Sequence, residues 1–526
     1  MVKLIQRAAR IRRAPIRRLA PVGLVALKQI PVALVKGDIH PATSEENGEK
    51  EELAQGGGVT HNVPIMKHRR GPSQSSAPVI QALTALLLCS VCATPAVGQE
   101  AGGIFDQTQT IAAKVGQLRG LAPKDRFQVG YKSREELREV VVTKIQEEYS
   151  QERLDSDGAM LIRLGMLPPG TDYGKLIVDL LSAQIAGFYD QKTDALYLVE
   201  GSDPATERVT IAHEIFHGIQ DQHFDLDTVS PPEHGPMGRD HNDDYLLATT
   251  ALVEGDATIL MFDFTYAEML PAGASLVDSP MFDSMIKPML ENLDPAAFGQ
   301  APGLADVPSW LGQSLIFPYL RGMTFVAALR KDRSWARANA AYRAPPRSTE
   351  HILHPEKYLA DEAPVLVVVD KSAMAEAVSA STGRAWRPTF DNVLGEFQIG
   401  LWLEALGVDA SPARSAASGW GGDRLIGLQD DEGTMLATLI STWDTEEDAI
   451  EFARTLEGAM STRHPDLTAQ TREGRHGRFI CGQSNGHRVL IERWGNWVVW
   501  SEGLPAQSPV RPLRDTIWNT RQIAAY

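Results

Sequence analysis

The sequence predicts an α+β protein: a mainly helical core with a small antiparallel sheet, followed by a C-terminal α+β domain. Three observations lead to this prediction. Helical patterns fill most of residues 104–182 and 204–331, two short β-branched and aromatic runs lie between them, and strand-like runs alternate with a helix after about residue 390.

The first 98 residues contain two different segments. Residues 66–98 have the order of a secretory signal peptide, with a Met-Lys-His-Arg-Arg head, an apolar run over 82–93, and small residues before a cleavage site after Gly98. We therefore expect an exported protein, periplasmic or extracellular, without a stable membrane anchor after cleavage; a retained anchor is the alternative. Residues 1–65 form a doubtful extension, explained either by a true start at Met66 or by a basic targeting arm.

Charge and cysteine content exclude some classes of function. Cys89 and Cys92 lie in the apolar run of the signal and are interpreted as filler, so the mature chain keeps Cys481 alone and forms no internal disulfide. The formal net charge is −16, although residues 1–98 carry 13 Lys and Arg against 6 Asp and Glu. Because the remaining body is still more acidic, we expect no nucleic-acid partner.

The mature chain divides into three predicted regions. Residues 99–182 form a helical region, either scaffold or propeptide, in which Ser133-Arg-Glu-Glu136 is a capping box. The core covers 183–385, with a hairpin over 185–199, helices beginning at Asp203-Pro204 and at about Tyr245, a loop over 228–242, and further helices over 280–292, 308–331 and 372–378. The C-terminal domain covers 386–526, with strands near 434–442, 478–481, 488–493 and 497–500 and a helix over 444–460.

The segment His213-Glu-Ile-Phe-His217 carries the chemistry. On a helix, residues four apart lie about 40° apart around the axis, so both imidazoles reach one ion. Zinc binds neutral imidazole. Glu214, which would lie beside the zinc, is in position to take a proton from an attacking water. The alternative is an amphipathic helix with two histidines that bind nothing.

Two residues compete for the third ligand. His223 lies six residues after His217, as in the extended HExxHxxGxxH class, but position 220 is Gln. An uninterrupted helix rotates His223 by about 240° from His217, away from the ion. Glu254 lies on the next helix, among apolar neighbours that do not explain a carboxylate, and Gly255 keeps that helix thin for a close approach to the catalytic helix. We favour Glu254, with Asp256 as a substitute or as a residue that orients an imidazole.

These residues resemble the Glu-zincin metallopeptidases, of the broad peptidase-MA-like group whose bacterial members are mostly uncharacterised. The resemblance rests on His213–His217, on Glu254-Gly-Asp-Ala257, and on a later Tyr-x-x-Gly-x-x-Phe-Val pattern at 319–326; residues 348–358 are also similar. It implies a zincin-like core, one Zn²⁺ per chain held by His213, His217 and Glu254, and Glu214 as general base. It also implies that Tyr319 donates a hydrogen bond to the oxyanion, with His354 as the alternative.

The sequence therefore predicts a zinc metallopeptidase that hydrolyses peptide or protein substrates. Position 258 is Thr, where thermolysin-like members have Asp, so the residues that support the ligands are expected to differ. Two alternatives stay open: a catalytically silent zincin-fold binding or scaffold protein, and a metzincin-like enzyme that uses His223.

Overall fold

The structure is a computed structural model of the chain. It describes residues 104–184, 187–190, 195–201, 204–229, 242–291, 307–330, 332–474 and 477–524. The predicted extension 1–65, the signal 66–98 with Cys89 and Cys92, the N-cap Asp203, the hairpin turn 191–194 and most of the loop 228–242 lie outside the described residues.

The first described region is mainly helical, as predicted, although a strand lies between its first two helices. It contains α4 (Ile104–Arg119), α5 (Arg134–Glu148), α6 (Gln151–Leu164) and α7 (Tyr173–Gln184). The predicted capping box begins α5: Ser133 accepts from the backbone N–H of Glu136, and the Glu136 side chain accepts from the N–H of Ser133. The local sequence therefore fixed where this helix starts.

The small sheet is mixed rather than purely antiparallel, so that part of the prediction is wrong. Strands β2 (Gly187–Asp190) and β3 (Ala195–Val199) pair antiparallel, as expected of the hairpin. A third strand, β1 (Gln128–Lys132), pairs with β3 in parallel and gives the order β1-β3-β2. The sequence did not reveal β1 because its partner lies far along the chain and no turn joins the two strands.

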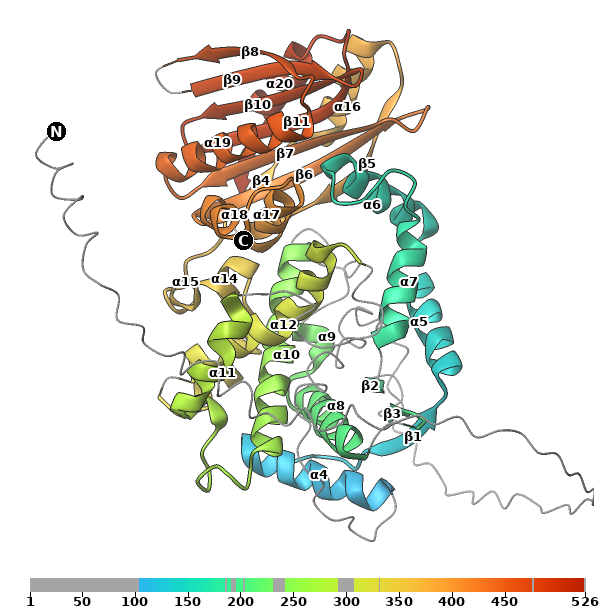
Figure 1. Ribbon diagram of the computed structural model, residues 1–526, viewed down its shortest axis with the longest axis vertical. Helices are drawn as coiled ribbons and strands as arrows, with labels where there is room; N and C mark the ends of the chain where they lie inside the picture. Colours follow the sequence, from blue (N-terminus) through green and yellow to red (C-terminus); the bar gives the residue numbers. More distant parts are fainter. Residues whose placement is uncertain are drawn as a thin grey trace, which may run out of the picture. The chain divides into compact units, whose positions relative to one another are not determined.

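Three long helices form the centre of the helical region (Figure 1): α8 (Pro204–Phe224), α10 (Asp243–Thr265) and α12 (Ser309–Leu329). The backbones of α10 and α12 touch, because a Cβ placed on Gly322 would lie 1.9 Å from the carbonyl oxygen of Ala251. Gly255 therefore allows α10 to approach α12 closely, whereas the sequence predicted a close approach to α8. Helix α10 is long and apolar enough to span a membrane by length and composition, yet 83% of its apolar window is buried inside the protein.

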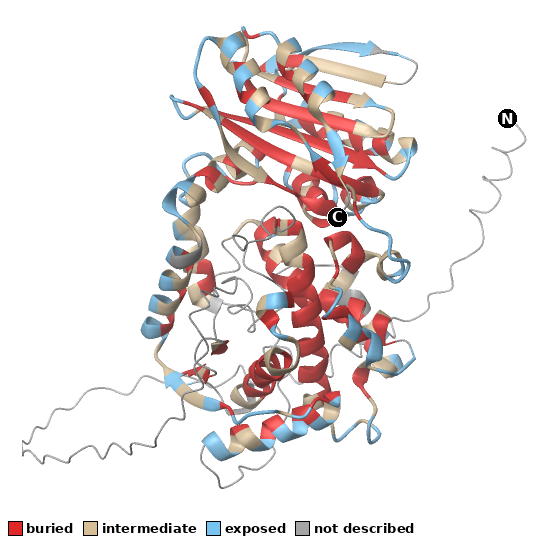
Figure 2. Ribbon diagram, turned by 180° about the vertical axis from the view of Figure 1, so that it is seen from behind, coloured by how far each residue is buried: buried red, intermediate tan, exposed pale blue. Residues whose placement is uncertain are grey.

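Shorter elements surround these helices and lead to the C-terminal part. They are α9 (Leu226–Val229), η2 (Leu276–Asp278), α11 (Pro280–Glu291), α13 (Ala336–Ala341), α14 (Thr349–Leu353), α15 (Pro355–Leu359), α17 (Gly395–Ala405) and α18 (Ala410–Ala417). Figure 2 shows that the ribbon of the central helices is buried, whereas the outer helices alternate between buried and exposed positions.

A seven-stranded antiparallel sheet dominates the C-terminal part, in the order β5-β6-β7-β11-β10-β9-β8. Its strands are β5 (Trp386–Asn392), β6 (Trp420–Asp430), β7 (Met435–Trp443), β8 (Thr468–Glu473), β9 (Gly477–Ser484), β10 (His487–Trp494) and β11 (Trp497–Pro505). The protein is therefore of mixed α and β class, as the sequence predicted.

Both faces of this sheet are covered by helices. Successive residues of a strand face opposite sides, and Leu439 belongs to one hydrophobic cluster while Ile440 belongs to the other. The first cluster includes α19 (Glu446–Arg463) and the second includes α16 (Lys371–Thr382) and α20 (Arg511–Thr520). Strand β4 (Leu366–Val368) pairs with β12 (Gln522–Ala524) in a separate two-stranded sheet. Val367 of β4 belongs to the second cluster, so segments before residue 386 also pack on the seven-stranded sheet.

Candidate metal centre

Helix α8 presents His213, Glu214 and His217 to the interior. The helix is uninterrupted from residue 204 to residue 224, and its apolar face, including Ile215 and Phe216, is fully buried. His213 and His217 lie one turn apart, with their rings nearly perpendicular and their centroids 4.7 Å apart. The helix thus provides the paired imidazoles that the motif predicted.

Glu254 on α10 completes a compact cluster with the two histidines. His213 Nε2 lies 3.0 Å from His217 Nε2, and these two nitrogens lie 3.2 and 3.3 Å from Glu254 Oε2. Ligands bound to zinc at about 2.0–2.1 Å in a tetrahedron are roughly 3.3–3.4 Å apart, so the three atoms already have nearly the spacing that a tetrahedral ion requires. They form the one group among the described residues that brings three metal-binding side chains this close.

The electrostatics of the cluster favour a positive charge at its centre. Burial lowers the pKa of His217, but the charge and hydrogen bond of Glu254 outweigh it and raise the pKa to about 9. Burial raises the pKa of Glu254, but the two histidines outweigh it and lower the pKa to about 2. The carboxylate is therefore held ionised, as a metal ligand must be.

Glu214 lies beside the cluster without joining it. Its Oε2 accepts a hydrogen bond from the backbone N–H of Tyr189 on β2, at 3.1 Å, while no described residue hydrogen-bonds to Oε1. Burial raises the pKa of Glu214, and the two histidines oppose this shift. The small sheet thus fixes one carboxylate oxygen and leaves the other available to accept a proton.

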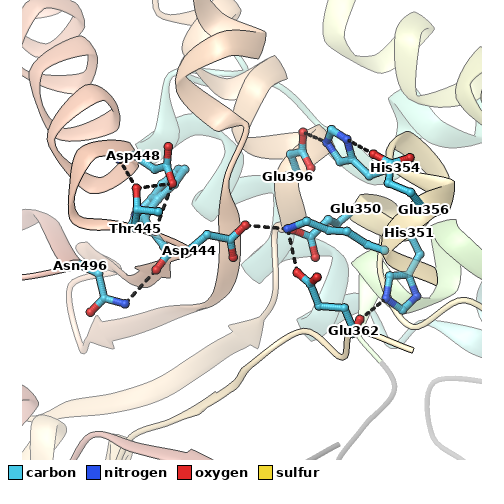
Figure 3. A network of polar contacts seen from close by, with 12 residues as sticks. Glu350, His351, His354, Glu356, Glu362, Glu396, Asp444, Thr445, Asp448 and Asn496 are labelled. Carbon is cyan, nitrogen blue, oxygen red and sulfur yellow. Dashed lines mark hydrogen bonds and ion pairs between the residues drawn. The ribbon is translucent and has the colours of Figure 1, made fainter. Parts of the chain in front are cut away.

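The remaining predicted residues fall in different places. Tyr319 is 1% exposed, and its ring centroid lies 6.2 Å from that of His213, so α12 brings it next to the cluster. His354 is instead 2.9 Å from Glu396 through Nε2 and 3.6 Å from Glu356 through Nδ1, in a separate polar network (Figure 3). His223 Nε2 contacts the carbonyl oxygen of Ala122 at 2.8 Å, so this histidine does not reach the cluster.

Gln220 is the functional residue that the sequence reasoning missed. Its Oε1 lies 2.8 Å from His217 Nδ1, on the side of the ring opposite the cluster. A hydrogen bond there sets which ring nitrogen is free to bind a metal. The signal was its position three residues after His217, on the same helical face.

An apolar cavity of about 210 Å³ lies between α6, α7, α10 and α12, and no residue of the cluster lines it. Thr250 of α10 and Leu315 of α12 are among the residues that line it. Each stands four residues, or about 6 Å along a helix, before Glu254 and Tyr319 respectively. The cavity therefore begins about one helical turn from the predicted chemistry.

A family model for a domain of unknown function (DUF8575) matches residues 386–513, which contain none of the cluster. No curated protein matches the chain. The chain is similar to a crystal structure described as "a putative hydrolase with a novel fold" from Chloroflexus aurantiacus, with 17% identity, coverage of 53% of this chain and 97% of that chain, and a TM-score of 0.29. Such a TM-score does not establish a common fold, so function has to be inferred from the site.

Proposed function

We propose that the chain is an exported zinc metallopeptidase of the Glu-zincin type, with a zincin-like core, acting on peptide or protein substrates. The observation that carries this proposal is the convergence of His213, His217 and Glu254 with a buried carboxylate, Glu214, beside them. Two imidazoles and one carboxylate leave a fourth tetrahedral position open, which distinguishes a catalytic zinc site from a closed structural one.

Each residue then has one task. Zinc, when bound to His213, His217 and Glu254, supplies a Lewis acid that polarises a carbonyl and acidifies water. Glu214 takes the proton of the attacking water on Oε1 and then returns it to the leaving amine. Its other oxygen, Oε2, meanwhile accepts from the backbone N–H of Tyr189. Tyr319, whose ring lies 6.2 Å from that of His213, would donate a hydrogen bond to the developing oxyanion.

The apolar cavity suggests a substrate preference. A cavity of about 150 Å³ accepts benzene, so a cavity of about 210 Å³ that begins one helical turn from Glu254 would have room for a large apolar side chain of the substrate. Leu247→Phe adds bulk to the lining, and we expect it to reduce kcat/KM for peptides with a large apolar side chain about tenfold relative to peptides with alanine there. Equal losses on both peptides would remove this assignment.

Glu214→Gln tests the proposed function. The variant should keep about one zinc per chain, because Glu214 is not a ligand, and lose peptide hydrolysis by at least about a thousandfold. Glu207→Gln is the matched control, because Glu207 lies near the start of the same helix, where it accepts from the Tyr131 hydroxyl. Zinc-loaded wild type without peptidase activity would instead favour a silent binding protein.

A further inference from the structure

A chain of buried hydrogen bonds leads away from His217 to the N-terminal helix. Gln220 Nε2 donates to the carbonyl oxygen of Val253 at 2.9 Å and to the hydroxyl of Tyr342 at 2.6 Å. The Tyr342 hydroxyl donates to Asp256 Oδ2 at 2.8 Å. Asp256 is held in turn by Arg119 of α4, and each of these side chains is almost fully buried.

The chemistry of these groups permits one arrangement of protons. The carbonyl of Val253 can only accept, so the side-chain nitrogen of Gln220 must face it and Oε1 must face His217. That oxygen also only accepts, so the neutral, metal-binding form of the His217 ring carries its single proton on Nδ1. The lone pair of His217 is consequently on Nε2, the atom that faces His213 and Glu254.

The far end of this chain is a buried ion pair. Arg119 Nε lies 2.9 and 3.2 Å from the two oxygens of Asp256, and neither side chain is exposed to solvent. The guanidinium also lies over the ring of Trp335, 3.9 Å from its centroid. This bidentate contact with Arg119 fixes the Asp256 carboxylate, whose Oδ2 also accepts from the Tyr342 hydroxyl.

Helix α4 and the segment after it are also packed against the catalytic helix. A Cβ on Gly218 would lie 2.3 Å from the ring of Phe127, so α8 accepts this aromatic ring only because residue 218 is glycine. The carbonyl of Ala122 meets His223, and the backbone N–H of Lys124 donates to Gln222 at 2.8 Å.

We propose that Gln220, Tyr342, Asp256 and Arg119 form a positioning relay that fixes His217 as an Nε2 ligand, which makes α4 a permanent part of the metal centre. This inference rests on the metal site of the proposed function, but not on peptide hydrolysis. On this proposal α4 is scaffold rather than propeptide, because its removal would take Arg119 from Asp256. His223 and Gln222 of α8 then hold the segment after α4 on this helix, through their contacts with Ala122 and Lys124.

Zinc affinity tests the relay. Tyr342→Phe removes one hydroxyl and keeps the ring, which stacks on Phe224 at 4.0 Å, so the fold is retained. We expect its zinc Kd, measured by competition with a chelator on the full chain, to rise about tenfold or more, as for other residues that orient a ligand. Tyr358→Phe is the control: it loses a hydroxyl that donates to Ala344, outside the relay, and its Kd should stay within about twofold.

A spectroscopic readout separates positioning from stability. In the cobalt-loaded protein, Tyr342→Phe and Gln220→Leu should change the visible ligand-field spectrum, whereas Tyr358→Phe should not. Arg119→Met should weaken zinc binding in the same direction. Equal Kd values and spectra for Tyr342→Phe and Tyr358→Phe would overturn the relay, and an unchanged Kd in Arg119→Met would remove α4 from it. A wild type that binds no metal would instead refute the proposed function.

Discussion

The crossing of α10 and α12 gives the most quantitative prediction, through Gly322→Ala. The new methyl carbon would lie 1.9 Å from the carbonyl oxygen of Ala251, whereas such contacts need about 3.4 Å. The two helices must therefore move apart locally by about 1.5 Å. Glu254 is three residues from Ala251 on α10, and Tyr319 is three residues from Gly322 on α12, so the movement reaches the site.

The expected cost follows from two opposing terms. Alanine in place of a helical glycine stabilises a protein by about 0.5–1 kcal/mol, while overpacking costs about 1–3 kcal/mol and more when the backbone itself must move. We expect Gly322→Ala to lower the free energy of unfolding by about 2 kcal/mol, and zinc affinity to fall at least about tenfold, because ligand distances tolerate only about 0.2 Å.

Urea unfolding and chelator competition measure both effects. Gly400→Ala is the matched control: this glycine also lies inside a buried helix, α17, but its Cβ would meet nothing closer than 3.8 Å. We expect the control to be neutral or stabilising by up to about 1 kcal/mol, with unchanged zinc affinity. If Gly322→Ala matches Gly400→Ala in both assays, the backbone contact between α10 and α12 does not position the site.

Three further predictions concern the surroundings of the site. Burial raises the pKa of Asp244 to about 7 against the opposing hydrogen bonds from Thr349. The stability that this carboxyl contributes is therefore complete below about pH 4 and is lost as the pH rises to 7. Asp244→Asn should flatten the plot of urea midpoint against pH over this range, and an unaltered plot would contradict the raised pKa of Asp244. Lys357→Met removes the ammonium that contacts Glu350 at 2.7 Å and Asp444 at 2.6 Å, two carboxylates of the network in Figure 3. The free energy of unfolding measured in urea should therefore fall by about 1–3 kcal/mol, and an unchanged value would show that these two contacts do not stabilise the fold. Chelation should lower the Tm of the native protein and added zinc should restore it, whereas a Tm indifferent to both would mean that no metal binds the folded state.

Local sequence patterns predicted several of the helices and strands, and they selected the three residues that the structure brings together. The spacing of His213 and His217 defines one face of a helix without reference to the rest of the chain, and the capping box at Ser133 needs only four residues. The sequence also selected Glu254, because a carboxylate among apolar neighbours is costly unless it has a partner.

Such local patterns could not predict contacts between residues that are far apart in the sequence. Gln220 meets Val253 and Tyr342, which are 33 and 122 residues away, so its role depends on how three elements pack. Gly255 was correctly read as a close contact, but its partner is Gly322 of α12 and not the catalytic helix. The parallel pairing of β1 with β3 was not predicted for the same reason, since the sequence of neither strand specifies the other as its partner.

The metal content of the purified native protein tests the central claim most directly. We expect about one zinc per chain in the wild type, a large loss in Glu254→Ala, and full retention in His223→Ala, whose ring contacts Ala122 and not the cluster. A native protein without bound metal, or one that loses zinc in His223→Ala and keeps it in Glu254→Ala, would contradict the assignment of His213, His217 and Glu254 as the ligands.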